Sequence, residues 1–473
     1  MKQTLALALI GLTLLACSNK NLSCGTAYFG GEIINPNNDH IILYDSNEPI
    51  DTLYLDMSNR FSYTIENLNP GLYSFVHGGE YQVMLIEPND SIMIRLNTYD
   101  FDESLVFNGR GSKKNNFLLG MFVEIEKQNR PMYEMGKKME PKAFVGVLDS
   151  IRTKRKDELA AFQDKYQASP LFSKVSNACI DYDYFAHKEI YPFRYFGNRY
   201  TSYSMLPEGY FEFRNEIDYN DEELKDFYPY YNFLFPHFNN LALGRYINQT
   251  KDTVFNRHSV HYNMSKLRLI DSLIGNESVR NNLLKYSTRN FLAYSSSDEE
   301  SDVIYTSFMQ KCSNVEHSDY ITDFYGTLKK LKPGFVLPNV DLVNLNKEVI
   351  PISDLIDRPS VLFFWSKSNK MHATNSHVKV KELKAQFPDL NFISVNVNAQ
   401  QFGSWQRMLG QYNFDRTNEF MLKDPEIATK LLALYNIYKV ILVDDDMTII
   451  HPNTNLYRRE MNKLLVKMSS TSL

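Results

Sequence analysis

Short alternating segments separated by turn residues fill the first quarter of the chain. Residues 61–65 alternate apolar and polar side chains, which is the period of a strand with one buried face. The Asn-Pro-Gly sequence at 69–71 is a strong turn signal, and residues 72–76 resume the strand pattern after it. Several short strands at this spacing predict a small β-sandwich-like domain over residues 28–110.

Beyond residue 111 the apolar positions change to helical spacing. Phe117, Met121 and Ile125 fall on one face of a helix, and this pattern predicts a central helical region over residues 111–331. Aromatic side chains crowd residues 182–238 of this region. They form an interhelical core, a stacking platform for sugar or peptide, or a protein-docking surface. We expect a core, because apolar rings usually pack inside a protein.

The last part of the chain opens with an apolar run. Residues 361–365 lack polar alternation, which predicts a strand that is buried on both faces. Polar residues then lead into an amphipathic helix, with Val380 and Leu383 on its buried stripe and Pro388 as its stop signal. Residues 391–397 have the composition of a second buried strand.

Further apolar stripes complete an alternating pattern of strands and helices. Asp424 followed by Pro425 predicts a helix N-cap with proline in the first turn. Residues 440–443 and 448–450 predict a hairpin. The apolar faces of the three remaining helices are assigned to Trp405, Met408, Leu409 and Tyr412, to Ile427, Leu431 and Leu434, and to Met461, Leu464, Leu465 and Met468. The order β-α-β-α-α-β-β-α predicts parallel strands joined through helices.

Length and composition bound the class of protein. With 473 residues the chain is too long for one compact core, so two to four domains are expected. It is 43% hydrophobic and carries a net charge of −5. Nothing in this balance suggests a nucleic-acid partner, which would favour a clustered basic face. We therefore expect a multidomain α+β and α/β protein, with an N-terminal β-sandwich, a helical centre and a C-terminal α/β domain.

The N-terminus resembles a bacterial lipoprotein signal. Lys2 supplies a short basic start, and residues 4–15 form an apolar run that is too short to span a bilayer. Ala16 then places a small residue directly before Cys17. The four features occur together in the order that such a signal requires.

This resemblance implies processing and anchoring. Residues 1–16 would be removed as a signal peptide, and Cys17 would be acylated, with palmitate expected. The lipid would hold the protein on a membrane of the cell envelope, outside the cytoplasm. Ser18 after the cysteine favours the outer membrane, and residues 17–27 would form a tether.

Residues 363–372 carry a second resemblance. Phe-Phe-Trp-Ser-Lys-Ser-Asn-Lys-Met-His is similar to the Phe-Trp-Ala-x-Trp-Cys-x-x-Cys active-site segment of thioredoxin-like proteins of the TlpA/ResA type. Residues 333–337 resemble the Pro-x-Phe-x-Leu entry of the same family. The resemblance implies a thioredoxin-like domain over residues 332–473. It places Asn369 and His372 at the two cysteine positions.

The chemistry of that family is missing from this segment. Thiol–disulfide exchange needs a thiolate, and the last cysteine, Cys312, precedes the domain. Residues 428–447 contain no proline where the family carries a cis-proline. We expect an envelope lipoprotein whose redox-inactive thioredoxin-like domain binds an envelope protein or peptide in assembly or uptake, without a cofactor or metal. The candidate binding residues are Trp365, Lys370 and Tyr438.

Three other groups of side chains leave alternatives. Cys179 and Cys312 would support a divergent thiol–disulfide oxidoreductase if they met in an oxidising periplasm, although free thiols are the expected state. His372 at a helix N-terminus is either a neutral imidazole that hydrogen-bonds locally or a solvent-facing side chain, and the solvent-facing position is expected. His258 and His261 are three residues apart, which is a metal-ligand spacing, but a structural role is expected for them.

Overall fold

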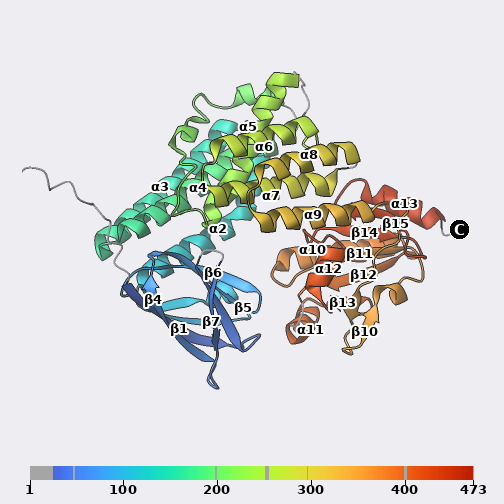
Figure 1. The fold of residues 1–473 in the computed structure, drawn as a ribbon, viewed down its shortest axis with the longest axis horizontal. Coiled ribbons are helices and arrows are strands. Elements are labelled where there is room, and N and C mark those ends of the chain that lie inside the picture. The colour runs from blue at the N-terminus through green and yellow to red at the C-terminus, as the bar shows by residue number, and fades with distance from the viewer. Residues whose placement is uncertain are drawn as a thin grey trace, which may run out of the picture. The chain divides into compact units, whose positions relative to one another are not determined.

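The computed structural model describes residues 25–45, 48–197, 200–250, 255–295, 297–398 and 402–471 (Figure 1). The predicted signal peptide, the lipidation site Cys17 and most of the predicted tether lie outside these residues. Within the described ranges, no helix is both long and apolar enough to cross a membrane. The chain divides into two compact units, Met1–Phe75 with Gln82–Met121, and Val76–Tyr81 with Phe122–Leu473.

Two four-stranded sheets form the N-terminal part. The first has the order β4-β1-β7-β8 and the second the order β3-β2-β5-β6. The ring of Phe29 in the first sheet lies 5.6 Å from that of Phe75 in the second, so the sheets share an apolar core. The strands are β1 (Gly25–Ile34), β2 (His40–Asp45), β3 (Glu48–Tyr54), β4 (Arg60–Leu68), β5 (Gly71–His77), β6 (Glu80–Ile86), β7 (Ser91–Asn97) and β8 (Val106–Arg110), with the short helix α1 (Phe101–Ser104) after β7.

Helices follow from Ser112 onward. Side-chain caps begin several of them, as at α4, where the Ser169 hydroxyl accepts a hydrogen bond from the Phe172 amide and Pro170 lies in the first turn. The helices are α2 (Ser112–Lys138), α3 (Pro141–Tyr166), α4 (Pro170–Tyr195), α5 (Tyr228–Thr250), α6 (Val260–Leu273), α7 (Glu277–Tyr294), α8 (Asp298–Lys311) and α9 (Val315–Lys330), with 3-10 turns η1 (Tyr200–Met205) and η2 (Glu212–Glu216).

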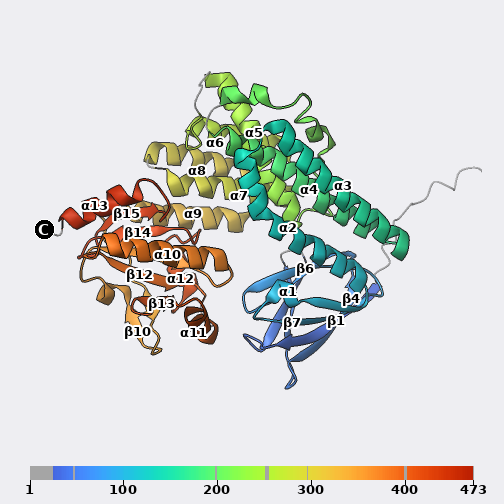
Figure 2. The same ribbon diagram turned by 180° about the vertical axis from the view of Figure 1, so that it is seen from behind.

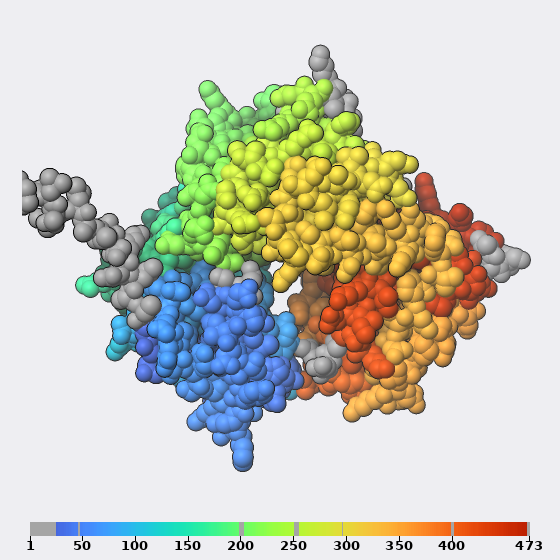
Figure 3. Space-filling model, in the orientation of Figure 1, coloured from blue at the N-terminus to red at the C-terminus, as the bar shows by residue number. Residues whose placement is uncertain are grey.

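The aromatic residues of this helical region form its core. Tyr191, Tyr230 and Phe233 are at most 1% exposed, and the rings of Tyr182 and Phe233 stack with centroids 5.3 Å apart. Tyr228 is an exception, with 52% of its surface exposed. The helices that these rings hold together are drawn in green and yellow in the space-filling view (Figure 3). The rings therefore pack the helices together, as expected, and do not form a platform.

The C-terminal part contains a seven-stranded sheet with the order β10-β9-β13-β12-β11-β14-β15. β11, β12 and β13 run parallel, β14 runs antiparallel to β11, and β15 runs antiparallel to β14. A parallel β-α-β unit followed by an antiparallel hairpin and a closing helix is a thioredoxin-like fold. The strands are β9 (Asp341–Val343), β10 (Val349–Pro351), β11 (Ser360–Trp365), β12 (Asn391–Asn396), β13 (Glu419–Leu422), β14 (Val440–Val443) and β15 (Ile449–Thr454).

Helices α10 (Lys370–Gln386), α11 (Phe402–Gln411), α12 (Pro425–Leu431) and α13 (Met461–Thr471) complete this domain. α10 lies across the sheet, as seen from behind in Figure 2. Val361, Phe363 and Trp365 of β11 pack in one apolar core with residues of α10, α11 and α13. This packing holds the end of β11 and the start of α10 in place.

Two sequence predictions for this domain were wrong. The order predicted no strand between the helices that are now α11 and α12, but β13 lies there and pairs with β12 and β9. β13 has only four residues and begins with Glu419, so it lacks the apolar run that marks a buried strand.

The predicted apolar face of α12 was also wrong. Ile427 and Leu431 are 55% and 39% exposed, whereas Ala428 and Leu432 are at most 2% exposed. The helix has only seven residues, so a stripe that continues to Leu434 does not apply to it. The predicted cap is confirmed, because Asp424 accepts a hydrogen bond from the Ile427 amide at 3.0 Å.

Candidate functional site

Asn369, which the resemblance of residues 363–372 aligns with the first cysteine of the TlpA/ResA-type segment, is the N-cap of α10. Its side-chain oxygen accepts a hydrogen bond from the His372 amide at 2.9 Å. Asparagine is among the best N-cap residues, because it satisfies an amide that has no partner within the helix. The residue in the position of the attacking thiol therefore stabilises the helix and carries no nucleophile.

His372 lies one turn later and is buried, with 5% of its surface exposed. Its ring centre is 4.4 Å from that of Tyr438, in an edge-to-face arrangement, and its Nε2 atom is 3.2 Å from the Ser376 hydroxyl. Burial, and to a smaller extent the nearby His377, lower its pKa from 6.5 to about 4. The prediction of a solvent-facing His372 was wrong, because Tyr438 comes from another segment and covers the imidazole.

Three exposed side chains surround this buried histidine, and we call them the tyrosine patch. They are Met371, Tyr438 and Tyr457, which are 59%, 40% and 49% exposed. Tyr457 lies near Ser376, one helical turn beyond His372, and partial burial raises the pKa of its hydroxyl. The start of α10 thus presents an aromatic and apolar surface.

The three predicted binding residues lie in different environments. Tyr438 belongs to the tyrosine patch, and Lys370 is exposed in the first turn of α10. Trp365 is fully buried, and its indole N–H donates a hydrogen bond to the Ser394 hydroxyl at 3.0 Å. Trp365 is therefore not available as a binding residue at the surface, because its strand is buried on both faces, as predicted.

The two cysteines of the helical region are free thiols in the structure. Cys179 is buried in α4, and burial raises the pKa of its thiol to about 12. Cys312 follows α8 and is half-buried, with its sulfur 3.5 Å from the Asn314 carbonyl oxygen. A thiol with so high a pKa is a poor nucleophile, so this geometry does not support exchange through Cys179.

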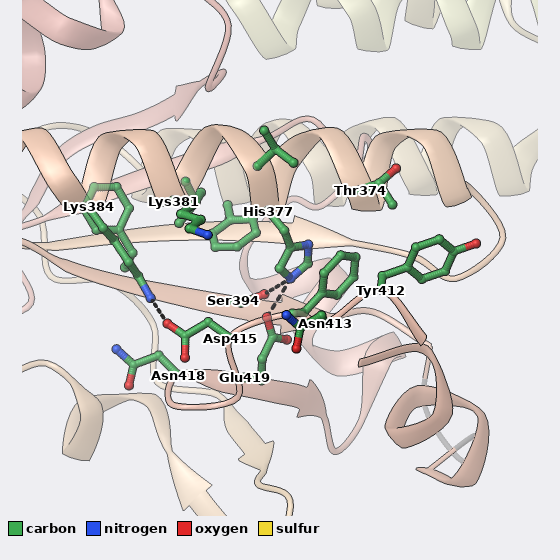
Figure 4. A pocket seen from close by; sticks show the side chains of 15 residues that line it. Thr374, His377, Lys381, Lys384, Ser394, Tyr412, Asn413, Asp415, Asn418 and Glu419 are labelled. Atoms are coloured by element: carbon green, nitrogen blue, oxygen red, sulfur yellow. Dashed lines mark hydrogen bonds and ion pairs between the residues drawn. The ribbon is translucent and has the colours of Figure 1, made fainter. Parts of the chain in front are cut away.

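A cavity of about 620 Å³ lies beneath α10, next to the sheet (Figure 4). His377 points from α10 toward Ser394 of β12 and Glu419 of β13 (Figure 4). Its Nε2 atom is 2.6 Å from Glu419 Oε1 and 3.3 Å from Ser394 Oγ. Its Nδ1 atom is 2.7 Å from the Ala373 carbonyl oxygen.

The ring of Phe414 stacks on one face of the His377 imidazole. The two rings are nearly parallel, at 4°, with centroids 3.7 Å apart. Phe414 lies in the segment between α11 and β13, so this segment and α10 together fix the plane of the imidazole.

This cluster does not have the geometry of a hydrolase triad, although it contains Ser, His and Glu. In a triad the nucleophile and the acid contact different nitrogens of the imidazole. Here Ser394 and Glu419 both approach Nε2, and a backbone carbonyl occupies Nδ1. Ser394 is also 4% exposed and accepts the hydrogen bond of Trp365. The hydroxyl is therefore not placed to attack a substrate.

Sequence reasoning missed this cluster. His377 is separated from Ser394 by 17 residues and from Glu419 by 42, so the three do not form a local sequence pattern. Glu419 also lies in the strand that was not predicted. One signal could have indicated the cluster. Glu419 begins a strand that is buried, and a buried carboxylate needs a polar or charged partner nearby.

Metal binding has little support in the described part of the chain. No group of three or more His, Cys, Asp or Glu side chains is arranged to hold a metal ion there. His258 precedes α6 while His261 lies within it, and the ring of His258 lies 5.9 Å from that of Tyr294. The two histidines are therefore not neighbours on one helical face.

No family model and no curated protein matches the sequence. Among solved structures, one similar chain is a proposed thiol-disulfide oxidoreductase from Bacteroides vulgatus, at 17% identity and a TM-score of 0.27, covering 29% of this chain and 98% of that one. Another is the C-terminal domain of a proposed thiol-disulfide oxidoreductase from Bacteroides thetaiotaomicron, at 20% identity and a TM-score of 0.26, covering 30% and 99%.

A third similar chain is a SCO1/SenC family lipoprotein from Bacillus anthracis, at 15% identity and a TM-score of 0.25, covering 30% of this chain and 98% of that one. These neighbours are thioredoxin-like proteins. At such identities and TM-scores they support no conclusion about this chain. The chemistry of this chain has to be judged from its own residues.

Proposed function

We propose that the C-terminal domain is a binding module that does not exchange disulfides. One observation carries this proposal: the two positions of the exchange centre hold a helix cap, Asn369, and a buried neutral imidazole, His372. Neither side chain attacks a disulfide, because the reaction needs a thiolate. The module would serve as an assembly or uptake accessory of the cell envelope.

The tyrosine patch is the proposed docking surface for an envelope protein or peptide. Tyrosine and methionine are enriched at protein interfaces, because they offer a large contact area with few polar groups to desolvate. The ring of Tyr438 packs edge-to-face on that of His372, with centroids 4.4 Å apart, and Tyr457 lies near Ser376. Such preorganised side chains lose less conformational entropy on binding than free ones.

A lipid anchor at Cys17 would place the module at the membrane, and the outer membrane is the proposed location. The basic start, the apolar run and the small residue before the cysteine support it. The Cys17→Ala variant is expected to leave the membrane fraction after a salt wash, while the wild-type protein stays. Retention of the variant would contradict the anchor.

Crosslinking tests the docking surface. A photoreactive phenylalanine at position 438 is expected to capture a protein from intact cells. The matched control is the same probe at Val466, which is 57% exposed on α13 of the same domain. Equal capture at both positions would contradict the tyrosine patch as the docking site.

An insulin-reduction assay tests the loss of exchange chemistry. No turnover is expected from the whole chain. Turnover that disappears in Cys179→Ser would instead establish a divergent periplasmic thiol–disulfide oxidoreductase. The two assays are independent, because the probe at position 438 touches neither cysteine.

A further inference from the structure

A groove of about 610 Å³ lies on the first sheet of the N-terminal sandwich. Its volume is within the range of roughly 300–1,000 Å³ that is usual for ligand sites. Strands β4, β1 and β7, which lie side by side in the blue part of Figure 1, supply most of the lining, and Tyr54 and Asp56 supply the rest. All of these residues belong to one compact unit, so the groove is formed within that unit.

The charged side chains of the groove balance one another. Glu32 lies in the central strand, directly opposite Arg60 of β4 and Arg95 of β7, and side chains of opposite residues share one face of a sheet. Asp56 is the second acid, and no other charged residue is found among the described residues that line the groove. Two cations and two anions leave the groove without a net charge that would select an ion.

The polar groups of the groove are open to a ligand. Within the described residues, Arg60 forms hydrogen bonds only through its main chain, so its guanidinium is unoccupied. Arg95 Nε lies 3.9 Å from Glu32 Oε2, which is too long for a hydrogen bond. Asp56 Oδ1 accepts from the amides of Ser58 and Arg60, at 2.8 and 2.9 Å, and this orients the carboxylate. The groove therefore offers N–H donors and carboxylate acceptors together.

An exposed aromatic ring completes the lining. Tyr54 is 70% exposed, and Met93 of β7 is 43% exposed. A tyrosine ring presents an apolar face, and at this exposure a ligand can reach it. A ligand that covers the ring removes apolar surface from water, which favours binding.

We propose that this groove binds a neutral saccharide. A sugar hydroxyl accepts one hydrogen bond and donates another, so neighbouring hydroxyls match a guanidinium and a carboxylate at the same time, here Arg60 with Glu32 or Asp56. The apolar C–H face of a pyranose ring stacks on an aromatic ring such as that of Tyr54. The site shares no residue with the tyrosine patch and goes beyond the proposed docking function.

A glycan array tests the class of ligand. The whole chain without residues 1–16, with Cys17→Ala, is applied to neutral oligosaccharides and to sialylated and sulfated ones. Saturable binding to one or more neutral oligosaccharides is expected, because the groove has no net charge. Binding to none of them, or to the acidic ones alone, would overturn the proposal.

Matched tyrosine variants test the stacking ring. Tyr54→Ala is expected to weaken the calorimetric affinity for the best neutral oligosaccharide about tenfold, whereas Tyr54→Phe keeps the ring and should stay within about threefold of the wild type. Tyr28→Ala is the control, since Tyr28 is 52% exposed on β1 of the same sheet but does not line the groove. Equal affinities of Tyr54→Ala and the wild type would overturn the assignment of the site.

Matched arginine variants test the polar contact. Arg60→Met removes the unoccupied guanidinium and is expected to weaken binding by at least about tenfold. Arg110→Met should leave the affinity unchanged, because Arg110 is an exposed arginine of β8 in the same sheet, outside the groove. An unchanged affinity in Arg60→Met would contradict the role of Arg60 in the site. If one of the variants fails to fold, as judged by circular dichroism, the array and the other pair of variants decide.

The saccharide site and the docking surface can fail separately. Tyr54→Ala is expected to leave the crosslinking from position 438 unchanged. Loss of that crosslinking in Tyr54→Ala would mean that the groove and the tyrosine patch are not independent sites.

Discussion

Two buried His–Glu pairs, one in the helical region and one in the C-terminal domain, differ in how completely the carboxylate is bonded. His237 Nδ1 lies 2.7 Å from Glu189 Oε1, and His377 Nε2 lies 2.6 Å from Glu419 Oε1. Around Glu189 both oxygens have further partners. Around Glu419, Oε2 has none in the described structure.

The first pair belongs to a closed network. Arg214 donates to both oxygens of Glu189, at 2.8 and 2.6 Å, and Asn240 donates to Oε2 at 2.8 Å. Burial alone would raise the pKa of Glu189, but the hydrogen bonds from His237 and Arg214 outweigh it and lower the pKa. The carboxylate therefore stays ionised and ties α4, α5 and η2 together.

The second pair belongs to an incomplete network beside a cavity. Buried polar groups in folded proteins are nearly always bonded, so an orphan oxygen needs an explanation. The comparison teaches that a buried ion pair by itself does not mark a site. The unmet hydrogen bond distinguishes the second pair from the first.

The largest expected loss of stability comes from removing Arg214 from the hydrogen-bond network around Glu189. Arg214→Met leaves the fully buried Glu189 without its cation, so the free energy of unfolding should fall by ~3–5 kcal/mol. Urea denaturation of the whole chain measures it. A loss below ~1 kcal/mol would mean that Glu189 is not held as a buried anion.

The next largest effect is expected from His372, a buried imidazole that belongs to neither pair, and it concerns how stability depends on pH. Burial lowers the pKa of His372 from 6.5 to about 4, so between these pH values the unfolded chain binds the proton and the folded chain does not. Stability should fall as the pH drops from 6.5 to 4, by ~2 kcal/mol from this group. The free energy of unfolding, measured between pH 4 and 6.5, should depend less on pH in His372→Gln than in the wild type. The same pH dependence in both proteins would contradict a buried neutral His372.

The Asn369 cap of α10 should contribute less to the free energy of unfolding. Asn369→Ala removes the acceptor for the His372 amide, and the unfolding free energy should fall by ~1 kcal/mol. Asn369→Ser keeps an acceptor and is the matched control, with most of the stability retained. If both variants lose the same amount, capping is not the role of Asn369.

The smallest effect is expected at the incomplete network. Glu419→Gln should change the unfolding free energy by less than ~1 kcal/mol, because Oε2 makes no bond to lose and the amide can still reach His377. Comparison with Glu189→Gln, in the same urea experiment, sharpens the contrast. Equal losses at the two positions would mean that Glu419 is as fully bonded as Glu189.

Much of the C-terminal fold could be predicted from local pattern. The apolar run of β11, the stripe of α10 and the Asp424 cap are each signals within a few neighbouring residues. β13 was not predicted, because its four residues begin with Glu419 and are too few to show the apolar pattern of a buried strand. The hairpin of β9 and β10 was not predicted either, because each strand has only three residues.

The sequence by itself determined that residues 332–473 contain no cysteine, and therefore that Asn369 and His372 carry no thiol, because this can be read without a structure. It also determined the strand and helix around Asn369. Only the tertiary structure decided that Tyr438 covers His372 and that His377 meets Glu419 across 42 residues. Periodicity reports which face of one element is buried, whereas the partner of a buried polar atom depends on which strands become neighbours in the sheet.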